Sequence, residues 1–206
     1  DQIDQRLVPR GLLFDGPPWT GKSAGAKWLA TQLGVPLYRL DMGTTKGKYI
    51  GDSEGALASN LAKLDREEPC VVLIDEVEKV LNRSEANDGG TTSSMLGQIL
   101  WWLAEHRSRV LTVMTTNDRS KLPAELYREG RIDQVLWFDG LELEDAILFM
   151  RQVVSTFDGV EVGVDTLRLI VLKLLNEHDK EKGTLGRVPQ ALLTKASYDL
   201  LKKSPI

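Results

Sequence analysis

The chain has 206 residues, of which 42% are apolar and 27% are charged, and its formal net charge is −4. This is the composition of an ordinary globular chain with room for one large domain or two small ones. The negative charge gives no support to a broad nucleic-acid-binding surface, and no apolar run approaches the roughly 20 residues of a membrane span. The single cysteine, Cys70, cannot form an internal disulfide, so we expect it to be buried and the setting to be cytosolic.

The chain opens on a polar stretch at Asp1 without a signal peptide, as expected of a domain excised from a longer protein. An apolar run over residues 11–14 predicts the first strand. Residues 22–33 carry apolar side chains at helical spacing and are followed by Gly34, which predicts a helix that ends there. The segment between them reads G-x-x-x-x-G-K-S, the phosphate-binding loop pattern.

A strand before this loop and a helix after it are the setting in which free backbone N–H groups and the positive end of a helix face a phosphate. Lys22 would then reach the outer phosphates of a nucleotide, and the Ser23 hydroxyl would bind Mg²⁺. The residues expected to bind the nucleotide are Gly16, Pro17, Pro18, Trp19, Thr20, Gly21, Lys22, Ser23 and Ala24.

Residues 36–42 predict a short second strand, 43–51 a loop, and 53–67 a helix. The run 70–74 is apolar and β-branched without alternation, which is typical of a strand buried on both faces of a parallel sheet. It ends in Asp75 and Glu76. Asp75 would hold Mg²⁺ opposite Ser23, and Glu76 would orient or deprotonate the attacking water. Glu78 and Lys79 are interpreted as surface or interface charges.

Residues 84–94 predict a loop, 95–106 a helix, and 110–116 another buried strand. Trp101 and Trp102, on that helix, are expected to pack in a core or an interface. Asn117 follows the strand and would hydrogen-bond the attacking water or the γ-phosphate. A short helix is expected over 123–127 and a fifth strand over 134–138.

Strands that alternate with helices over residues 11–138 indicate a parallel α/β sheet. Strand signals stop after Gly140, and three amphipathic helices follow over 142–157, 165–177 and 188–202, with a loop at 179–186. We therefore predict a five-stranded parallel P-loop sheet flanked by helices in residues 1–140, and a small all-helical lid in residues 141–206.

Together these motifs resemble the AAA+ ATPase family. Residues 16–23 look like its Walker A motif, 71–76 like Walker B, 115–118 like sensor 1, and 122–133 like its second region of homology. The last match points to the branch that includes FtsH and katanin. The segment 75–103 is similar to uncharacterised members of that branch from plastids, cyanobacteria and phages, so the cytosolic setting includes a plastid stroma or a phage-infected bacterium.

The resemblance implies an enzyme that hydrolyses ATP with Mg²⁺ in a homo-oligomeric ring, usually a hexamer. This chain would form the ring by itself, or only when ATP is bound, or only as part of the full-length protein. Arg128 and Arg131 would act in trans on the neighbour's γ-phosphate, since guanidinium groups stabilise charge on a transferring phosphoryl group. Lys48, Tyr49, Ile50 and Gly51 would form a pore loop that grips an unfolded polypeptide. Arg187, at the start of the last helix, would be sensor 2, a nucleotide-binding arginine that contacts the γ-phosphate from the lid, or a plain surface arginine.

Trp19 departs from the family pattern, which has glycine there, and it would be strained if the backbone requires a positive φ. We expect the module to remodel or thread a protein substrate. One alternative is a DNA-handling loader or initiator, for which the loop supplies only two basic charges, Lys46 and Lys48. The other is a nucleotide-dependent assembly switch with little turnover, which Trp19 favours.

Overall fold

The computed structural model describes residues 9–40, 50–81, 91–128, 130–157, 162–182 and 186–203. The chain folds into two compact units. The sheet unit contains the residues up to Gly16 together with Lys22–Trp137, and the helical unit contains Pro17–Gly21 together with the residues from Phe138 onward. The division into domains at residue 140 stays a prediction.

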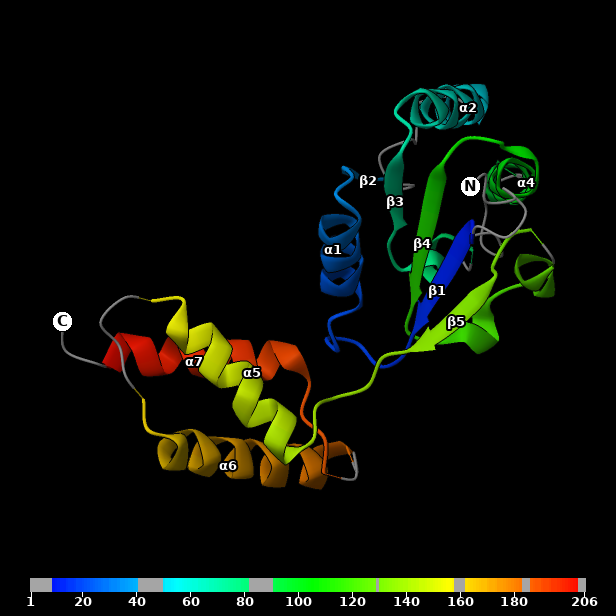
Figure 1. The fold of residues 1–206 in the computed structure, drawn as a ribbon. Helices are drawn as coiled ribbons and strands as arrows, with labels where there is room; N and C mark the ends of the chain where they lie inside the picture. Colours follow the sequence, from blue (N-terminus) through cyan, green and yellow to red (C-terminus); the bar gives the residue numbers. More distant parts are fainter. Residues whose placement is uncertain are drawn as a thin grey trace. The chain divides into compact units, whose positions relative to one another are not determined.

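Five parallel strands form the sheet unit, in the order β2-β3-β4-β1-β5 (Figure 1). The strands are β1 (Gly11–Asp15), β2 (Leu37–Arg39), β3 (Cys70–Ile74), β4 (Val110–Thr116) and β5 (Gln134–Trp137). The predicted fold class is confirmed: a five-stranded parallel sheet flanked by helices, followed by a helical part. Because β3, β4 and β1 are neighbours, the polar residues that follow their carboxyl ends are brought to one edge of the sheet.

Most helices of the sheet unit were predicted, but their ends and two short elements differ. The helices are α1 (Lys22–Leu33), α2 (Ile50–Arg66), α3 (Val77–Leu81), α4 (Thr91–Glu105), η3 (Arg119–Lys121) and η4 (Ala124–Tyr127). The α4 helix begins inside the predicted loop 84–94, and α3 and η3 were not predicted. Elements of one turn show no apolar period, and polar residues can open a helix whose later turns are packed, so the sequence pattern did not reveal these features.

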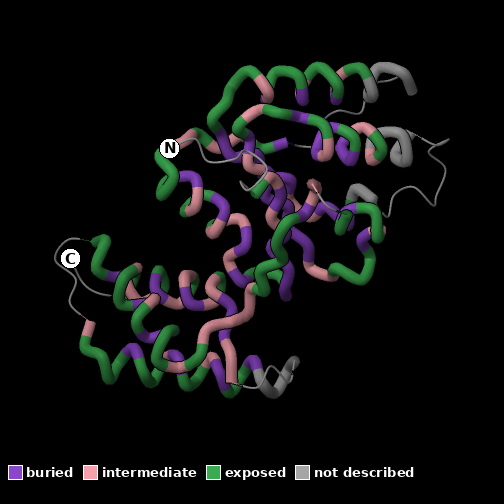
Figure 2. The backbone as a smooth tube through the Cα atoms, turned by 45° about the vertical axis from the view of Figure 1, so that its right-hand side comes forward, coloured by how far each residue is buried: buried purple, intermediate pink, exposed green. Residues whose placement is uncertain are grey.

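The core of the sheet unit follows the alternation of side chains along its strands. Leu13, Val72 and Met114 lie in one buried cluster with side chains of α2 and α4. The alternate residues of β3 are just as buried and face the other side, where Figure 1 shows α1. Figure 2 shows buried stretches concentrated in the middle of the sheet unit and recurring at intervals along its longer helices. Burial on both faces explains why the β3 sequence does not alternate.

Cys70 and Trp102 both lie in the core of the sheet unit. Cys70 is 2% exposed, as expected. Trp102 is 4% exposed and its indole Nε1 donates to both carboxylate oxygens of Asp65 at 3.0 Å. Trp101 is 67% exposed, so only Trp102 packs in the core.

Three helices form the rest of the helical unit: α5 (Leu143–Ser155), α6 (Val164–Lys182) and α7 (Gln190–Lys203). Their facing apolar side chains, which include Ala146, Met150 and Leu193, make a separate core. The α6 helix runs into the segment predicted as a loop at 179–186. Among the residues described in both units, no helix is long and apolar enough to cross a bilayer.

A buried polar cluster lies where α4 leads into β4. The His106 ring stacks on Trp102 with centroids 4.5 Å apart, and its Nδ1 lies 3.1 Å from Ser108 Oγ. Ser108 in turn donates to Asp65 at 2.6 Å. His106 is 6% exposed, and its Nε2 has no hydrogen-bond partner in the described part of the chain. Burial lowers the pKa of His106, and the nearby Asp65 carboxylate opposes that effect.

The lowered pKa makes the stability of the chain depend on pH. As the pH falls, His106 takes up a proton near pH 6.5 in the unfolded chain, and at a lower pH in the folded chain. The contribution of neutral His106 to the free energy of unfolding is therefore complete above about pH 6.5 and is lost as the pH falls towards the folded pKa. Urea unfolding should therefore show that His106→Gln loses less free energy of unfolding than the wild type between about pH 7.5 and 5.5. An equal loss in both proteins would show that His106 does not titrate differently on folding.

Candidate functional site

The loop between β1 and α1 has the backbone conformations that the sequence pattern requires. Gly16 and Gly21 have φ values of 147° and 93°, which favour glycine. Trp19 has φ 68° and is 62% exposed. The Thr20 hydroxyl donates to the Pro17 carbonyl at 2.9 Å and closes the turn. The expected strain at Trp19 is therefore present, since a side chain in the left-handed region costs about 1–2 kcal/mol relative to glycine.

The Lys22 ammonium lies where the loop meets α1. Its Nζ donates to the Gly16 carbonyl at 2.6 Å and to Asn117 Oδ1 at 3.0 Å, and the residue is 7% exposed. Burial lowers the pKa of Lys22, and nearby carboxylates, Glu78 and Asp15 foremost, oppose that effect. Both of these acceptors are neutral oxygens, and hydrogen bonds from an ammonium to an anionic ligand are stronger than those to neutral oxygens.

Ser23 and Asp75 lie in contact, as the proposed metal site requires. Ser23 Oγ is 2.9 and 3.1 Å from the two carboxylate oxygens of Asp75. Thr115, buried at the end of β4, donates from Oγ1 to Asp75 at 2.5 Å, and the Nη2 of Arg39 lies 3.5 Å from the same carboxylate. A carboxylate and a hydroxyl are hard oxygen ligands, and Mg²⁺ keeps several of its waters, so these two residues fit that ion. Thr115 lies in the segment predicted as sensor 1, but no role of its own was predicted for it or for Arg39.

Glu76 follows Asp75 in an unusual backbone conformation. Its φ is 52°, and its backbone N–H donates to Thr115 Oγ1 at 2.9 Å. Its carboxylate lies 2.6 Å from the exposed Lys79 ammonium. Positive φ in a residue other than glycine is found at functional sites, where the surrounding structure holds the strain. Lys79 lies at the surface, as expected.

The interpretation of Glu78 as a surface or interface charge is wrong. Glu78 is 6% exposed, and its Oε1 accepts from the backbone N–H of Asn117 at 3.1 Å and from its side-chain Nδ2 at 3.0 Å. The unpredicted α3 helix explains the error, because its single turn directs Glu78 to the end of β4 while Lys79 faces solvent. A chain of contacts thus runs from Glu78 through Asn117 to Lys22.

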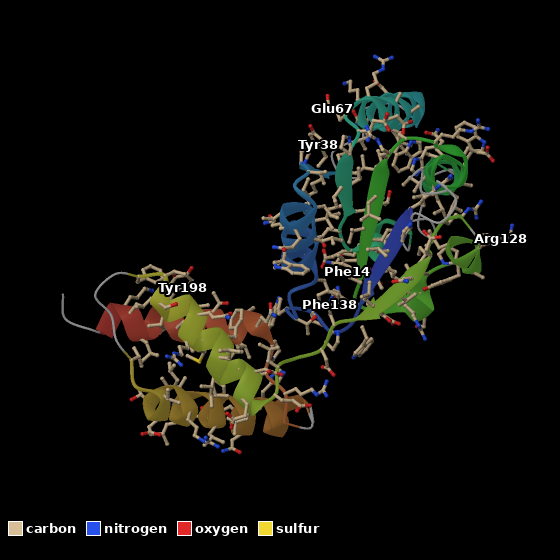
Figure 3. All side chains as sticks on the ribbon, in the orientation of Figure 1. Phe14, Tyr38, Glu67, Arg128, Phe138 and Tyr198 are labelled. Carbon is tan, nitrogen blue, oxygen red and sulfur yellow. The ribbon has the colours of Figure 1, made fainter. Side chains whose placement is uncertain are left out.

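The two candidate arginines lie elsewhere in the sheet unit. Arg128 is exposed at the end of η4, and Figure 3 shows it across the sheet from α1, the helix that begins at Lys22. The Nη1 of Arg131 donates to the Glu125 carbonyl at 2.6 Å. The structure therefore does not bring these arginines to the Lys22 group of the same chain.

Arg187 lies in the helical unit, between two carboxylates. Its Nη1 is 2.6 Å from Asp139 Oδ2, and its Nη2 is 2.8 Å from Glu142 Oε1. The hydrogen bond to Asp139 raises the pKa of Arg187 further above its usual value. A role as sensor 2 would require Arg187 to leave these partners.

The predicted pore loop lies mostly outside the described residues. This applies to Lys48 and Tyr49, and to Lys46 before them. Ile50 and Gly51 open the α2 helix.

The contacts of Thr115 lead to a test with a matched control in the same strand. Thr115→Val removes both hydrogen bonds of the hydroxyl and leaves the Glu76 N–H without its acceptor, so we expect the free energy of unfolding to fall by about 1–3 kcal/mol. Thr112 is equally buried, but its Oγ1 has no hydrogen-bond partner within the described ranges. Thr112→Val should therefore be neutral or stabilising in urea unfolding. Equal losses in both variants would contradict the assigned contacts.

Comparison with known proteins agrees with this geometry. The sequence model of the ATPase family associated with various cellular activities (AAA) matches residues 12–140. The uncharacterised AAA domain-containing protein ycf46 of Guillardia theta is 41% identical over 135 residues, which are 65% of this chain and 26% of that protein. The chain thus spans about a quarter of the length of such relatives.

Two further relatives extend the similarity towards the helical unit. The uncharacterised AAA family ATPase y4kL of Sinorhizobium fredii is 29% identical over 174 residues, which are 82% of this chain and 50% of that protein. The ATPase family gene 2 protein of Saccharomyces cerevisiae is 29% identical over 165 residues, 77% of this chain and 20% of that protein. The family match covers more than half of the chain, including the loop, Asp75, Glu76 and Asn117, and the chain therefore belongs to the AAA family of ATPases.

Proposed function

We propose that this domain binds ATP with Mg²⁺ and hydrolyses the bond to the γ-phosphate. The observation that carries the proposal is the buried Lys22 ammonium, which lies beside Asn117 and directly precedes the Ser23–Asp75 pair. Phosphoryl transfer needs little covalent chemistry from the protein, and catalysis comes from positioning and from charge stabilisation. This group supplies a cation, oxygen ligands for a metal, a carboxylate and an amide.

Each residue has a distinct role in this proposal. Lys22 and the first N–H groups of α1 would bind the phosphates. Ser23 and Asp75 would hold Mg²⁺, which when bound neutralises phosphate charge. Glu76 would orient or deprotonate the attacking water after leaving Lys79, and Asn117 would donate to that water or to the γ-phosphate.

We also propose that the active form is a ring of identical chains, of the FtsH/katanin-like branch. The position of Arg128 across the sheet from α1 supports a contact with the nucleotide of a neighbouring chain (Figure 3). Head-to-tail contacts of that kind generate closed rings. The work of the ring would be to remodel or thread a protein substrate gripped by residues 48–51, in a cytoplasmic or stromal setting.

A mixing experiment tests the shared site. Steady-state ATP hydrolysis per chain should rise with protein concentration in the wild type, and Glu76→Gln and Arg128→Ala should each lower it by about 100-fold or more. In an equal mixture of the two variants, about half of the chains have an intact Glu76, and about half of their neighbours have an intact Arg128. About a quarter of the shared sites are then complete, so about a quarter of the wild-type rate should return. A mixture as inactive as its components would contradict action in trans.

The same assay separates the alternative functions. If the wild type binds ATP but shows no turnover at any concentration, and Trp19→Gly restores turnover, the domain is a switch limited by its strained loop. Stimulation by DNA that disappears at high salt would instead identify a DNA-handling factor. Stimulation by an unfolded polypeptide, lost in Tyr49→Ala, is the result we expect.

A further inference from the structure

We propose that Glu78 is a positioning residue for this reaction, whose carboxylate fixes the side-chain amide of Asn117 in the one orientation that serves the site. The inference rests on the proposed ATP hydrolysis. It assigns a function to a residue that the sequence pattern placed at the surface.

The geometry of the contact explains how the amide is fixed. One oxygen of Glu78 accepts two hydrogen bonds from the same residue, at 3.1 Å from the backbone N–H of Asn117 and at 3.0 Å from its Nδ2. An ionised carboxylate has no proton to donate, so it can face only the NH₂ side of the amide. The Oδ1 of Asn117 must then point the other way, where it lies 3.0 Å from the Lys22 ammonium.

The reversed amide would be unfavourable at both ends. Its oxygen would face the Glu78 carboxylate, and its NH₂ group would face the Lys22 ammonium, so an acceptor would meet an acceptor and a donor would meet a donor. Each mismatch leaves a buried polar group without a partner, which is unfavourable. The carboxylate and the ammonium therefore set the amide direction jointly.

This orientation leaves the amide able to act on the substrate. The Nδ2 group carries two hydrogens, and Glu78 engages one of them. The second hydrogen is available for the attacking water or the γ-phosphate, the ligands that the proposed function assigns to Asn117. Glu78 lies three residues after Asp75, so one short segment carries the metal ligand, the water-orienting Glu76 and the residue that fixes Asn117.

The burial of Glu78 is costly for the fold. The residue is 6% exposed, and its second oxygen, Oε2, has no hydrogen-bond partner among the residues that the structure describes. A buried carboxylate oxygen without a partner lowers stability, and a catalytic role is one of the reasons for which native proteins keep such groups.

Two variants of similar size separate the hydrogen bond from packing. Glu78→Gln keeps an oxygen that can accept both N–H groups of Asn117, whereas Glu78→Met fills the same space with no comparable acceptor. We expect Glu78→Met to lower kcat by about tenfold or more with KM changed less than about threefold, because the amide acts on the reaction rather than on ATP binding. Glu78→Gln should stay within about threefold of the wild-type kcat, and the exposed Glu105→Ala serves as the control.

A double-mutant cycle tests whether Glu78 acts through Asn117. Asn117→Ala alone should lower kcat about as much as Glu78→Met, and the double variant should be no slower than Asn117→Ala, since the two residues form one unit. If Glu78→Met lowers kcat by its full factor in the Asn117→Ala background, or if Gln and Met lower it equally, the inference is overturned.

A second readout does not depend on turnover. The nucleotide-free chain is labelled with ¹⁵N at asparagine, and the side-chain NH₂ signals of Asn117 are identified by their loss in Asn117→Ala. The hydrogens of this NH₂ group should exchange with water about tenfold faster in Glu78→Met than in Glu78→Gln. Equal exchange rates would overturn the inference whether or not the protein hydrolyses ATP. A wild type without turnover but with this difference in exchange rates would refute the proposed function alone, and would leave Glu78 as the residue that fixes the amide.

Discussion

The buried ammonium of Lys22 is the constraint on which the rest of the site depends. A charge removed from water at 7% exposure is tolerated only if oxygen atoms surround it. The fold supplies them from separate segments: the Gly16 carbonyl from the loop and the Asn117 amide from the end of β4. These segments meet because β1 and β4 pair in parallel, with Asp15 opposite Thr116. The strand order of the sheet is thus a requirement of the chemistry as well as of the core.

The strand ends also hold one another in place through hydroxyl groups. Thr115 accepts from the Glu76 N–H and donates to Asp75, which Ser23 contacts from the start of α1. Hydrogen bonds to charged groups are stronger than those between neutral groups, and here they tie two segments, the end of β4 and the start of α1, to one carboxylate. Glu76, which follows β3, adopts a positive φ beside this network, since its N–H donates to Thr115. The sheet is otherwise regular. A backbone conformation that is locally unfavourable is expected at a site whose geometry is set by function.

Much of this arrangement could be predicted from the sequence, and the reasons are local. The loop pattern has fixed spacing, and glycine occupies the two positions of that pattern, 16 and 21, where φ is positive. The 70–74 run has no alternation. The role of Glu78 could not be predicted, because its direction depends on the single turn of α3, too short to show a period. Arg187 shows a similar limit. Its place before the last helix suggested a phosphate contact, but its partners Asp139 and Glu142 are more than 40 residues away in the chain and become neighbours only through folding.

The most direct test of whether the buried ammonium belongs to a nucleotide site is calorimetric titration with ATP. The wild type and Lys22→Met are each titrated with and without Mg²⁺. Methionine fills the space of the lysine stem without its charge, so a loss of affinity would report the ammonium rather than packing. We predict that the wild type binds ATP, that Mg²⁺ strengthens the binding, and that Lys22→Met weakens it by about tenfold or more. Equal affinity for ATP in the two proteins would contradict the assignment of Lys22 to the phosphates.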